Sequence, residues 1–234
     1  MITLLTATGA RPVAWALCEM WMAAQDYAGP VRWVIVDDGL TPQPITFQRP
    51  GWELVLIRPS PFWEPGMNTQ ARNIQKGLGA CDPRFPVIFI EDDDHYAPDW
   101  LSHVTKHLEG HELVGEVRAR YYNFHTKTAR QLANTMHSSL CSTAIQGIRA
   151  LKALQAYCQP GVKFIDLNLW RNFRGKKQLF AGTRVTGIKG LPGREGIGMG
   201  HQPDFVGTPD RNQDILRSWI GANAVRIYNE HIVS

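Results

Sequence analysis

The sequence predicts an α/β fold in which a mostly parallel central sheet is flanked by helices. Four short stretches are rich in the apolar, β-branched and aromatic residues of buried strands, namely Met1–Thr6, Val31–Val36, Trp52–Ile57 and Val87–Ile90. Two segments with helical spacing of apolar residues lie between them, Val13–Gln25 and Asn68–Leu78. Strand, helix and strand at this spacing imply parallel pairing through right-handed crossovers.

Local signals in the first half support these elements in order. Pro12 suits the first turn of the helix after Met1–Thr6, because its φ is already helical and its missing N–H needs no partner there. Gly29-Pro30 closes the stretch that contains this helix. Two proline-rich connections are expected, over Thr41–Pro50 and Arg58–Met67.

The second half has weaker periodicity. We expect a helix over Trp100–Leu108, one or two strands over Glu112–Phe124, a strand or helix over Ser138–Ile148, helices over Ala150–Tyr157 and Val162–Phe173, a strand over Leu179–Ile188 and a last helix over Asp210–Ala224. Seven glycines from Gly187 to Gly207 predict irregular structure there. We expect one domain over residues 1–234, with a nucleotide-facing half, 1–98, and a partner-facing half, 99–234.

The composition favours a folded cytoplasmic protein. Hydrophobic residues make up 44% of the chain, which argues against disorder. The 4 cysteines are far apart and form no Cys-x-x-Cys, which favours free thiols in a reducing cytoplasm. No apolar run approaches the roughly 20 residues of a membrane span, and the N-terminal stretch lacks a basic leader. The net charge of +4 suits an anionic substrate, a nucleic acid or a membrane surface.

Acidic residues follow two of the expected strands. Asp37 and Asp38 end the strand near residue 36, and the run Glu91–Asp94 follows Val87–Ile90. The carboxyl ends of parallel strands meet at one edge of the sheet, where open α/β sheets bind ligands. Carboxylates at that edge suit Mg²⁺ or Mn²⁺ carrying a substrate diphosphate. The alternative is a solvated acidic turn.

Four motifs, in this order, resemble those of the family-two glycosyltransferases of the GT-A fold. They are Thr6-Ala7-Thr8-Gly9-Ala10-Arg11-Pro12, Val34-Ile35-Val36-Asp37-Asp38-Gly39, Asn68-Thr69-Gln70-Ala71-Arg72-Asn73, and Phe89-Ile90-Glu91-Asp92-Asp93-Asp94 with Pro98 beyond it. The resemblance implies a GT-A (Rossmann-like) fold. It also implies an enzyme that moves a sugar from a nucleotide diphosphate sugar, a UDP-sugar by preference, to an acceptor hydroxyl with inversion.

The resemblance also implies roles for particular residues. Asp38 would read the base of the donor, and Arg72 would balance diphosphate charge or brace the acidic strand. Glu91 stands where the family has its first aspartate, so whether Glu91 or Asp92 reaches the metal or the ribose stays open. The implied donor-binding residues are Thr6, Thr8, Arg11, Asp38, Arg72 and Asp92, and the implied ligands of Mn²⁺ or Mg²⁺ are Glu91, Asp93 and His201.

Two candidates lie in the second half. Phe164–Trp170 resembles the family's Glu-Asp-x-Asp-Leu helix, and Asp166 is the acid of that pattern that survives. An inverting transfer needs a carboxylate to take the proton of the attacking hydroxyl, so Asp166 is the candidate base, with a helix N-cap or surface acid as the alternative. His201 follows several glycines that would form a lid. Its imidazole would favour Mn²⁺ over Mg²⁺, and a solvated or structural histidine is the alternative.

Other functions compete with this interpretation. A sugar-phosphate nucleotidyltransferase shares such a sheet and metal, but its first turn normally carries a glycine-rich basic loop where this chain has only Gly9 and Arg11. A non-catalytic nucleic-acid or glycan-binding module would use the basic, aromatic segment Trp170–Lys177. His103 and His107 have the spacing of a zinc site but flank an apolar helix face, which favours a solvated position.

No motif identifies the acceptor. Small, basic enzymes of this general kind occur in phages that glycosylate modified bases of their own DNA. A hydroxymethylated base in phage DNA is therefore the first hypothesis for the acceptor, which would place the enzyme in the host cytoplasm. Hydroxyl groups of proteins, of glycans and of small molecules are the alternatives.

Overall fold

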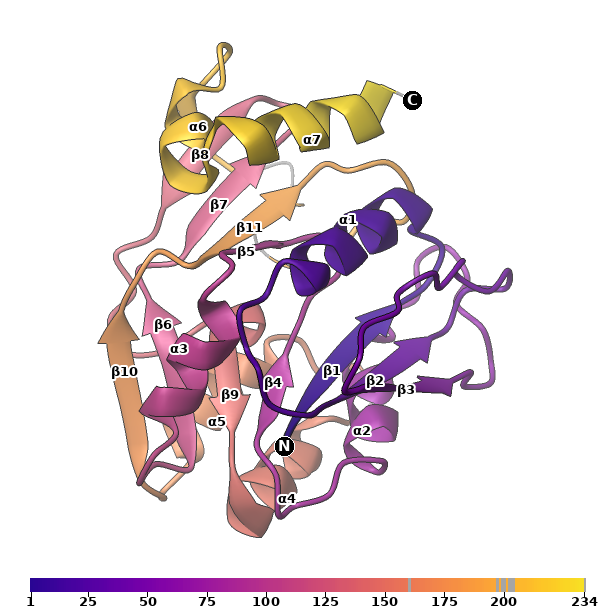
Figure 1. Ribbon diagram of the computed structural model, residues 1–234, viewed down its shortest axis with the longest axis vertical. Coiled ribbons are helices and arrows are strands. Elements are labelled where there is room, and N and C mark those ends of the chain that lie inside the picture. Colours follow the sequence, from indigo (N-terminus) through magenta and orange to yellow (C-terminus); the bar gives the residue numbers. More distant parts are fainter. Residues whose placement is uncertain (160, 197, 199–200, 202–204, 234) are drawn as a thin grey trace.

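The computed structural model describes residues 1–159, 161–196, 198, 201 and 205–233. Its main element is a seven-stranded sheet with helices on both faces (Figure 1). The strands of this sheet are β1 (Ile2–Thr8), β2 (Val31–Asp37), β3 (Trp52–Ile57), β4 (Val87–Phe89), β6 (Leu113–Val117), β9 (Thr143–Ile145) and β10 (Lys177–Ala181). Their order is β10-β6-β9-β4-β1-β2-β3. All neighbouring pairs are parallel except those of β9, which confirms the predicted mostly parallel sheet.

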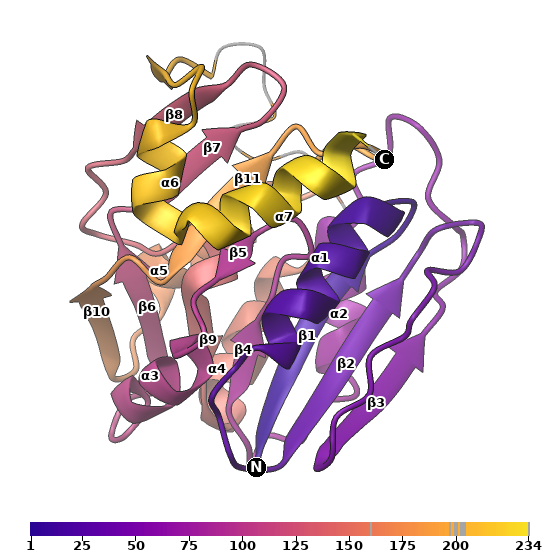
Figure 2. The same ribbon diagram turned by 45° about the horizontal axis from the view of Figure 1, so that its top comes forward.

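A second, five-stranded sheet packs beside the first (Figure 2). Its order is β12-β8-β7-β11-β5, where the strands are β5 (His95–Tyr96), β7 (Arg120–Asn123), β8 (Thr128–Gln131), β11 (Val185–Lys189) and β12 (Thr208–Pro209). The chain passes directly from a strand of the first sheet to one of the second from β6 to β7 and again from β10 to β11. Strands β6 and β10 are parallel neighbours in the first sheet. Strands β7 and β11, which follow them in the chain, are parallel neighbours in the second sheet.

The helices cover the two faces of the large sheet with separate apolar cores. Helices α1 (Pro12–Ala23), α3 (Trp100–His107) and α7 (Ala222–Val233) share one core, and α7 lies along α1 (Figure 2). Helices α2 (Gln70–Leu78), α4 (Gly147–Tyr157) and α5 (Ile165–Asn172) share the other. Successive strand residues point to opposite faces, so Leu4 joins the first core and Leu5 the second. Among the described residues no helix is long and apolar enough to cross a membrane.

The single strand predicted over Leu179–Ile188 is wrong, because β10 and β11 belong to different sheets. Buried Glu116 explains the break, since its carboxylate accepts the backbone N–H groups of Arg184 (3.1 Å) and Val185 (3.5 Å). These N–H groups lie where the chain leaves one sheet for the other. The segment Glu112–Phe124, predicted to form one or two strands, forms two, β6 and β7, which also belong to different sheets.

The single last helix predicted over Asp210–Ala224 is also wrong. Asp210 accepts the N–H groups of Ile215 (3.1 Å) and Leu216 (2.9 Å), so helix α6 (Asp214–Ile220) begins after it. Gly221 has φ +85° and ψ 156°, a positive-φ conformation that separates α6 from α7 and that glycine adopts without strain.

Other boundaries differ less. The segment Ser138–Ile148, for which the sequence allows either strand or helix, contains a 3₁₀ turn (Leu140–Ser142), β9 and the start of α4. The glycine-rich stretch begins inside β11, so its first residues are regular, against the prediction. Strand β8 is not among the predicted elements. Residues 197, 199–200 and 202–204 of the expected lid lie outside the described residues.

Candidate active site

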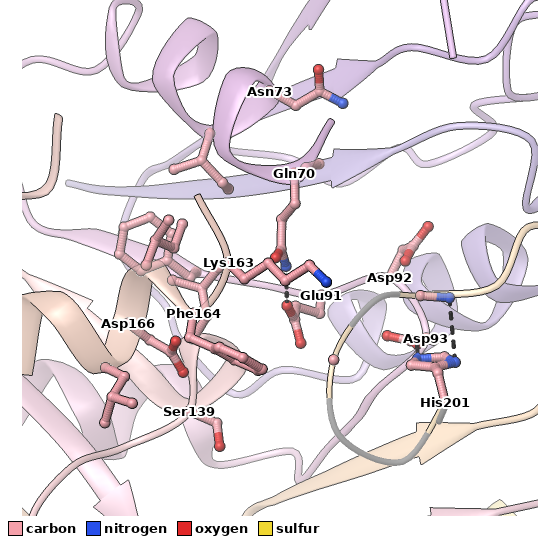
Figure 3. A pocket seen from close by; sticks show the side chains of 18 of the residues that line it. Gln70, Asn73, Glu91, Asp92, Asp93, Ser139, Lys163, Phe164, Asp166 and His201 are labelled. Atoms are coloured by element: carbon pink, nitrogen blue, oxygen red, sulfur yellow. Dashed lines mark hydrogen bonds and ion pairs between the residues drawn. The ribbon is translucent and has the colours of Figure 1, made fainter. Parts of the chain in front are cut away.

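A cavity of about 490 Å³ lies at the carboxyl ends of β1 and β4. One side, here called the acidic wall, consists of Thr8, Arg11, Glu91, Asp92, Asp93, Lys189 and His201. The opposite side, the α5 wall, consists of Met136, Ser139, Lys163, Phe164, Asp166 and Arg171. Figure 3 shows Phe164 and Asp166 on one side of this space and Asp92 and Asp93 on the other, with Lys163 and Glu91 between them in this view. The structure therefore brings Asp166 and the acidic run to one cavity from segments about 70 residues apart in the chain.

The acidic run is buried. Asp92, Asp93 and Asp94 are 1%, 3% and 0% exposed, so the alternative of a solvated acidic turn is excluded. Asp92 accepts a hydrogen bond from Thr8 Oγ1 (2.7 Å), which ties the end of β4 to the end of β1. Buried carboxylates of this density require cationic partners, because isolated charges cannot be removed from water at an acceptable free energy.

Two basic side chains supply those partners. Arg11 donates to Asp92 Oδ1 (2.7 Å) and to Asp93 Oδ2 (2.7 Å). Lys189, at the end of β11, donates to Asp93 Oδ2 (3.1 Å) and to Asp94 Oδ1 (2.8 Å). His201 Nε2 lies 3.4 Å from Asp93 Oδ2. All three basic groups meet the same oxygen of Asp93, and its other oxygen takes part in none of these contacts.

The electrostatics differ along the run. Burial opposes ionisation of Asp93, but Arg11 and Lys189 outweigh it and hold the pKa of Asp93 well below its usual value. Burial, with the negative charge of Asp94 adding to it, raises the pKa of Glu91 well above the usual 4.5. Burial raises the pKa of Asp94 to about 6, although Lys189 partly offsets it. Burial lowers the pKa of His201, which favours the neutral imidazole that metals bind.

The acidic wall suits a divalent cation. One oxygen of Glu91 accepts a hydrogen bond from Gln70 Nε2 (2.8 Å), and burial, with the negative charge of Asp94 adding to it, raises the pKa of Glu91 although Lys189 opposes this. A Mg²⁺ or Mn²⁺ ion carried by phosphates needs only one or two protein carboxylates, which Glu91 and Asp93 could supply. However, the ligand atoms of Glu91, Asp93 and His201 do not all lie within 4.8 Å of one another. Among the described residues the converging group is Glu91, Asp94 and Cys141, within 4.8 Å.

The predicted residues Thr6, Asp38 and Arg72 do not line the cavity. Thr6 Oγ1 accepts the indole N–H of Trp33 (2.9 Å) within the core. Asp38 is fully buried, and Arg72 donates to its Oδ2 (3.0 Å). Gly9 lies against Asp38, with φ +144°, and a Cβ there would lie 2.4 Å from Asp38 Oδ1. Asp38 therefore lies one layer behind the cavity surface.

Asp166 lies in the first turn of α5, and burial raises its pKa even though backbone N–H groups oppose this. Phe164 precedes the helix in a left-handed conformation (φ 55°, ψ 54°) and is 53% exposed. A bulky residue at positive φ is strained, and such strain is concentrated at functional sites. Lys163 and Arg171 are exposed on either side. The α5 wall thus combines one carboxyl group of raised pKa with an exposed ring and two cations.

The remaining sequence candidates lie elsewhere. His107 stacks on Phe180 with ring centroids 3.9 Å apart, and neither His103 nor His107 belongs to a metal-binding group of described residues. In the basic segment, Lys177 donates to the carbonyl of Trp170 (2.9 Å), and Arg171 reaches the cavity.

The cavity residues that are not among the predicted site residues include Lys189, Arg194 and Asn68. Lys189 ends a β-prone run, and a single lysine at the end of a buried strand could have indicated a partner for the buried carboxylates. Arg194 lies among glycines, and nothing near it in the chain indicates that it reaches Asp38. Asn68 belongs to one of the four motifs, but the resemblance implies no role for it.

Comparisons with known proteins establish the fold. No protein-family model matches the chain, and no curated protein matches it. Among solved structures it is similar to S. aureus TarS, with a TM-score of 0.59 and 13% identity over 80% of this chain and 37% of that one. It is also similar to TarS 1–349 with UDP (TM-score 0.55, 11% identity, covering 80% and 60%) and with UDP-GlcNAc (0.56, 12%, 99% and 71%). TarS has a GT-A-like glycosyltransferase fold, and this chain shares that fold while spanning little more than a third of TarS.

Proposed function

We propose that this chain is a glycosyltransferase that moves a sugar from a nucleotide diphosphate sugar to an acceptor hydroxyl with inversion. The observation that carries the proposal is the cavity itself, in which a buried acidic wall faces one carboxyl group of raised pKa, Asp166. The solved complexes of TarS with UDP and UDP-GlcNAc support a UDP-sugar as donor.

The acidic wall would hold the donor. Arg11 is anchored by Asp92 and Asp93 and lines the cavity, so its guanidinium would contact the diphosphate while staying fixed. Glu91 and Asp93 would hold Mn²⁺ or Mg²⁺, and His201 would have to move toward Glu91 to become a third ligand. That ion, when bound, acts as a Lewis acid that stabilises the departing diphosphate. Asp92, held by Thr8 and Arg11, fixes the edge on which the donor lies.

Asp166 would act as the general base. The acceptor hydroxyl oxygen attacks the anomeric carbon, the bond from that carbon to the diphosphate oxygen breaks, and the diphosphate leaves with the electron pair. The hydroxyl proton passes to Asp166, whose raised pKa makes it a better proton acceptor than an ordinary aspartate. A single displacement of this kind inverts the anomeric centre.

The α5 wall supports a phosphate-bearing acceptor, and we infer that it is DNA with a hydroxymethylated base, as in phages. Lys163 and Arg171 are exposed cations at the cavity rim, where they suit phosphates. Phe164 offers a ring on which an unstacked base can lie next to Asp166. Such a base must leave the duplex to reach the anomeric carbon.

Two assays test the proposal. Hydrolysis of UDP-sugars by the full chain is measured with Mn²⁺, with Mg²⁺ and with EDTA, using Asp93→Asn as the inactive control. Mass spectrometry then detects hexose added to hydroxymethylated DNA, with a polysaccharide and small alcohols as competing acceptors. Failure to turn over any UDP-sugar would contradict the donor assignment, and transfer only to the polysaccharide or the alcohols would contradict the DNA acceptor.

A further inference from the structure

The side chain of Arg194 lies between the cavity and Asp38. Its Nη1 donates to Asp38 Oδ1 (2.7 Å), and its Nη2 donates to Thr69 Oγ1 (2.7 Å). The guanidinium also lies over the indole ring of Trp63, 4.7 Å from the ring centroid. A planar group with N–H donors therefore already fills a space bounded by a carboxylate, a hydroxyl and an aromatic face.

Arg194 forms the surface that closes this space. Arg194 lines the cavity, whereas Asp38, Thr69 and Trp63 do not. The remaining Asp38 oxygen is occupied by Thr69 Oγ1 (2.5 Å) and Arg72 (3.0 Å). With Arg194 in place, no ligand in the cavity can reach Asp38.

The segment that carries Arg194 is fixed to the turn after β1. The Arg194 N–H donates to the carbonyl of Ala10 (3.0 Å), and Gly193 lies so close that a Cβ there would be 2.8 Å from the same oxygen. The side chain would therefore have to leave by rotating about its own bonds. Burial lowers the pKa of Arg194, so its enclosure costs free energy that Asp38 partly offsets.

A second observation points to a ligand in the same cavity. Asn68 lines the cavity and precedes Thr69 in the chain, and neither the nitrogen nor the oxygen of its buried side-chain amide has a hydrogen-bond partner among the described residues. A buried amide with both groups unused is uncommon. Its adjacent donor and acceptor match the edge of a heterocyclic base.

We propose that Arg194 holds the place of the donor's base until the donor arrives. Asp38 is the residue that the resemblance implies for reading that base, and Trp63, Asn68 and Thr69 would complete the space around it. A uracil-type ring has the required features, since it is planar, carries one N–H for Asp38 and offers carbonyl oxygens to Asn68 and Thr69. Its stacking on Trp63 replaces that of the guanidinium. The proposal rests on the proposed function, because it concerns the donor of that reaction.

The consequence is that Arg194 competes with the base. A subsite that is open for only a fraction of the time binds its ligand more weakly by that fraction. Removing the guanidinium should therefore strengthen the binding of a ligand that has a base but no phosphate.

Uridine is the appropriate probe, because it lacks the diphosphate that Arg11 and Lys189 would attract. Isothermal titration of the full chain with uridine is compared for the wild type, Arg194→Met and Arg194→Gln. Both variants should bind uridine about tenfold more tightly. Adding Trp63→Leu to Arg194→Met should weaken binding again by at least about fivefold, because the stacking surface is removed. Arg184→Met is the matched control, because Arg184 pairs with Asp99 (2.8 Å) and does not line the cavity.

The outcomes separate this proposal from the proposed function. If the chain turns over a UDP-sugar and the Arg194 variants bind uridine no more tightly than the wild type, the occupied subsite is wrong and the enzyme assignment stands. If no UDP-sugar binds or reacts, both are wrong. Thermal unfolding of each variant identifies any that fails to fold, and the two Arg194 substitutions then serve as checks on each other.

Discussion

The two walls of the cavity are built in opposite ways. The acidic wall is buried, and its charges are held by specific partners, as in the contacts of Asp93 with Arg11 and Lys189. The α5 wall presents exposed side chains, including Phe164 at 53% and Met136 at 81% exposure. A fixed ionic surface suits one invariant ligand group such as a diphosphate, whereas an exposed surface can adapt to a larger partner. Substitutions in the two walls should therefore affect different quantities.

The largest effect is expected for Asp166, the carboxyl group that the α5 wall contributes to the cavity. Asp166→Asn should lower the transfer rate by about 10²–10⁴, because the amide cannot accept the hydroxyl proton. UDP binding should stay unchanged, as measured by titration. Asp26→Asn, an exposed aspartate outside the cavity, is the control. A variant that keeps full transfer activity would remove Asp166 from the mechanism.

Next in size is the stability of the acidic wall. Lys189→Met should lower the free energy of unfolding by about 3–5 kcal/mol, because it leaves Asp93 and Asp94 buried without their shared partner. Denaturant unfolding of Lys152→Met, an exposed lysine, should differ from wild type by less than about 0.5 kcal/mol. Equal effects of the two substitutions would show that the network contributes no more than surface charge does.

Unfolding free energy and transfer rate, both measured over a pH series, test the protonation of Asp166 and its role as base. Its folded pKa lies above the usual 3.8, so its contribution to the free energy of unfolding is present below that value and is lost as the pH rises through the folded pKa. The stability of Asp166→Asn relative to wild type should therefore increase over this range in denaturant titrations. Transfer by the wild type should increase over the same range, because the base must be ionised. Opposite trends would contradict the assignment.

A smaller effect is expected at the exposed rim. The double variant Lys163→Gln/Arg171→Gln should raise the KM for DNA several-fold. It should also reduce the dependence of DNA affinity on salt concentration, by about 1 in the logarithmic slope for each phosphate that is no longer neutralised. The KM for the UDP-sugar and the unfolding midpoint should hardly change. Lys152→Gln is the control. A rise in the KM for the UDP-sugar alone would show that Lys163 and Arg171 contact the donor and not the DNA.

The smallest effect is expected for a glycine-to-alanine substitution near each wall, which compares the backbone strain of the two walls. Gly161 lies two residues before Lys163 of the α5 wall at φ +79°, and a Cβ there meets nothing within 4 Å, so Gly161→Ala should cost only about 1 kcal/mol of backbone strain. Gly9→Ala should cost more, since its Cβ would collide with Asp38 as well. Denaturant unfolding of both variants measures the difference, and equal costs would show that Asp38 can move.

Most of the first sheet can be predicted from the sequence, because local signals suffice there. The predicted bounds of Trp52–Ile57 match β3, and Glu91–Asp94 follow β4 as expected. Contacts between segments that are distant in the chain cannot be predicted from local sequence signals. Lys189 lies 96 residues from Asp93, and Arg194 lies 156 residues from Asp38. The switch from β10 to β11 depends on Glu116, which belongs to another strand.

The short strand β9 has a consequence for any attempt to shorten the chain. It is the antiparallel neighbour that covers one edge of β4, and it comes from Thr143–Ile145. A fragment of residues 1–98 would leave that edge bare, and unpaired backbone next to Val87 and Phe89 is a template for self-association. We therefore expect such a fragment to aggregate even though it contains nearly all of the residues predicted to hold the donor.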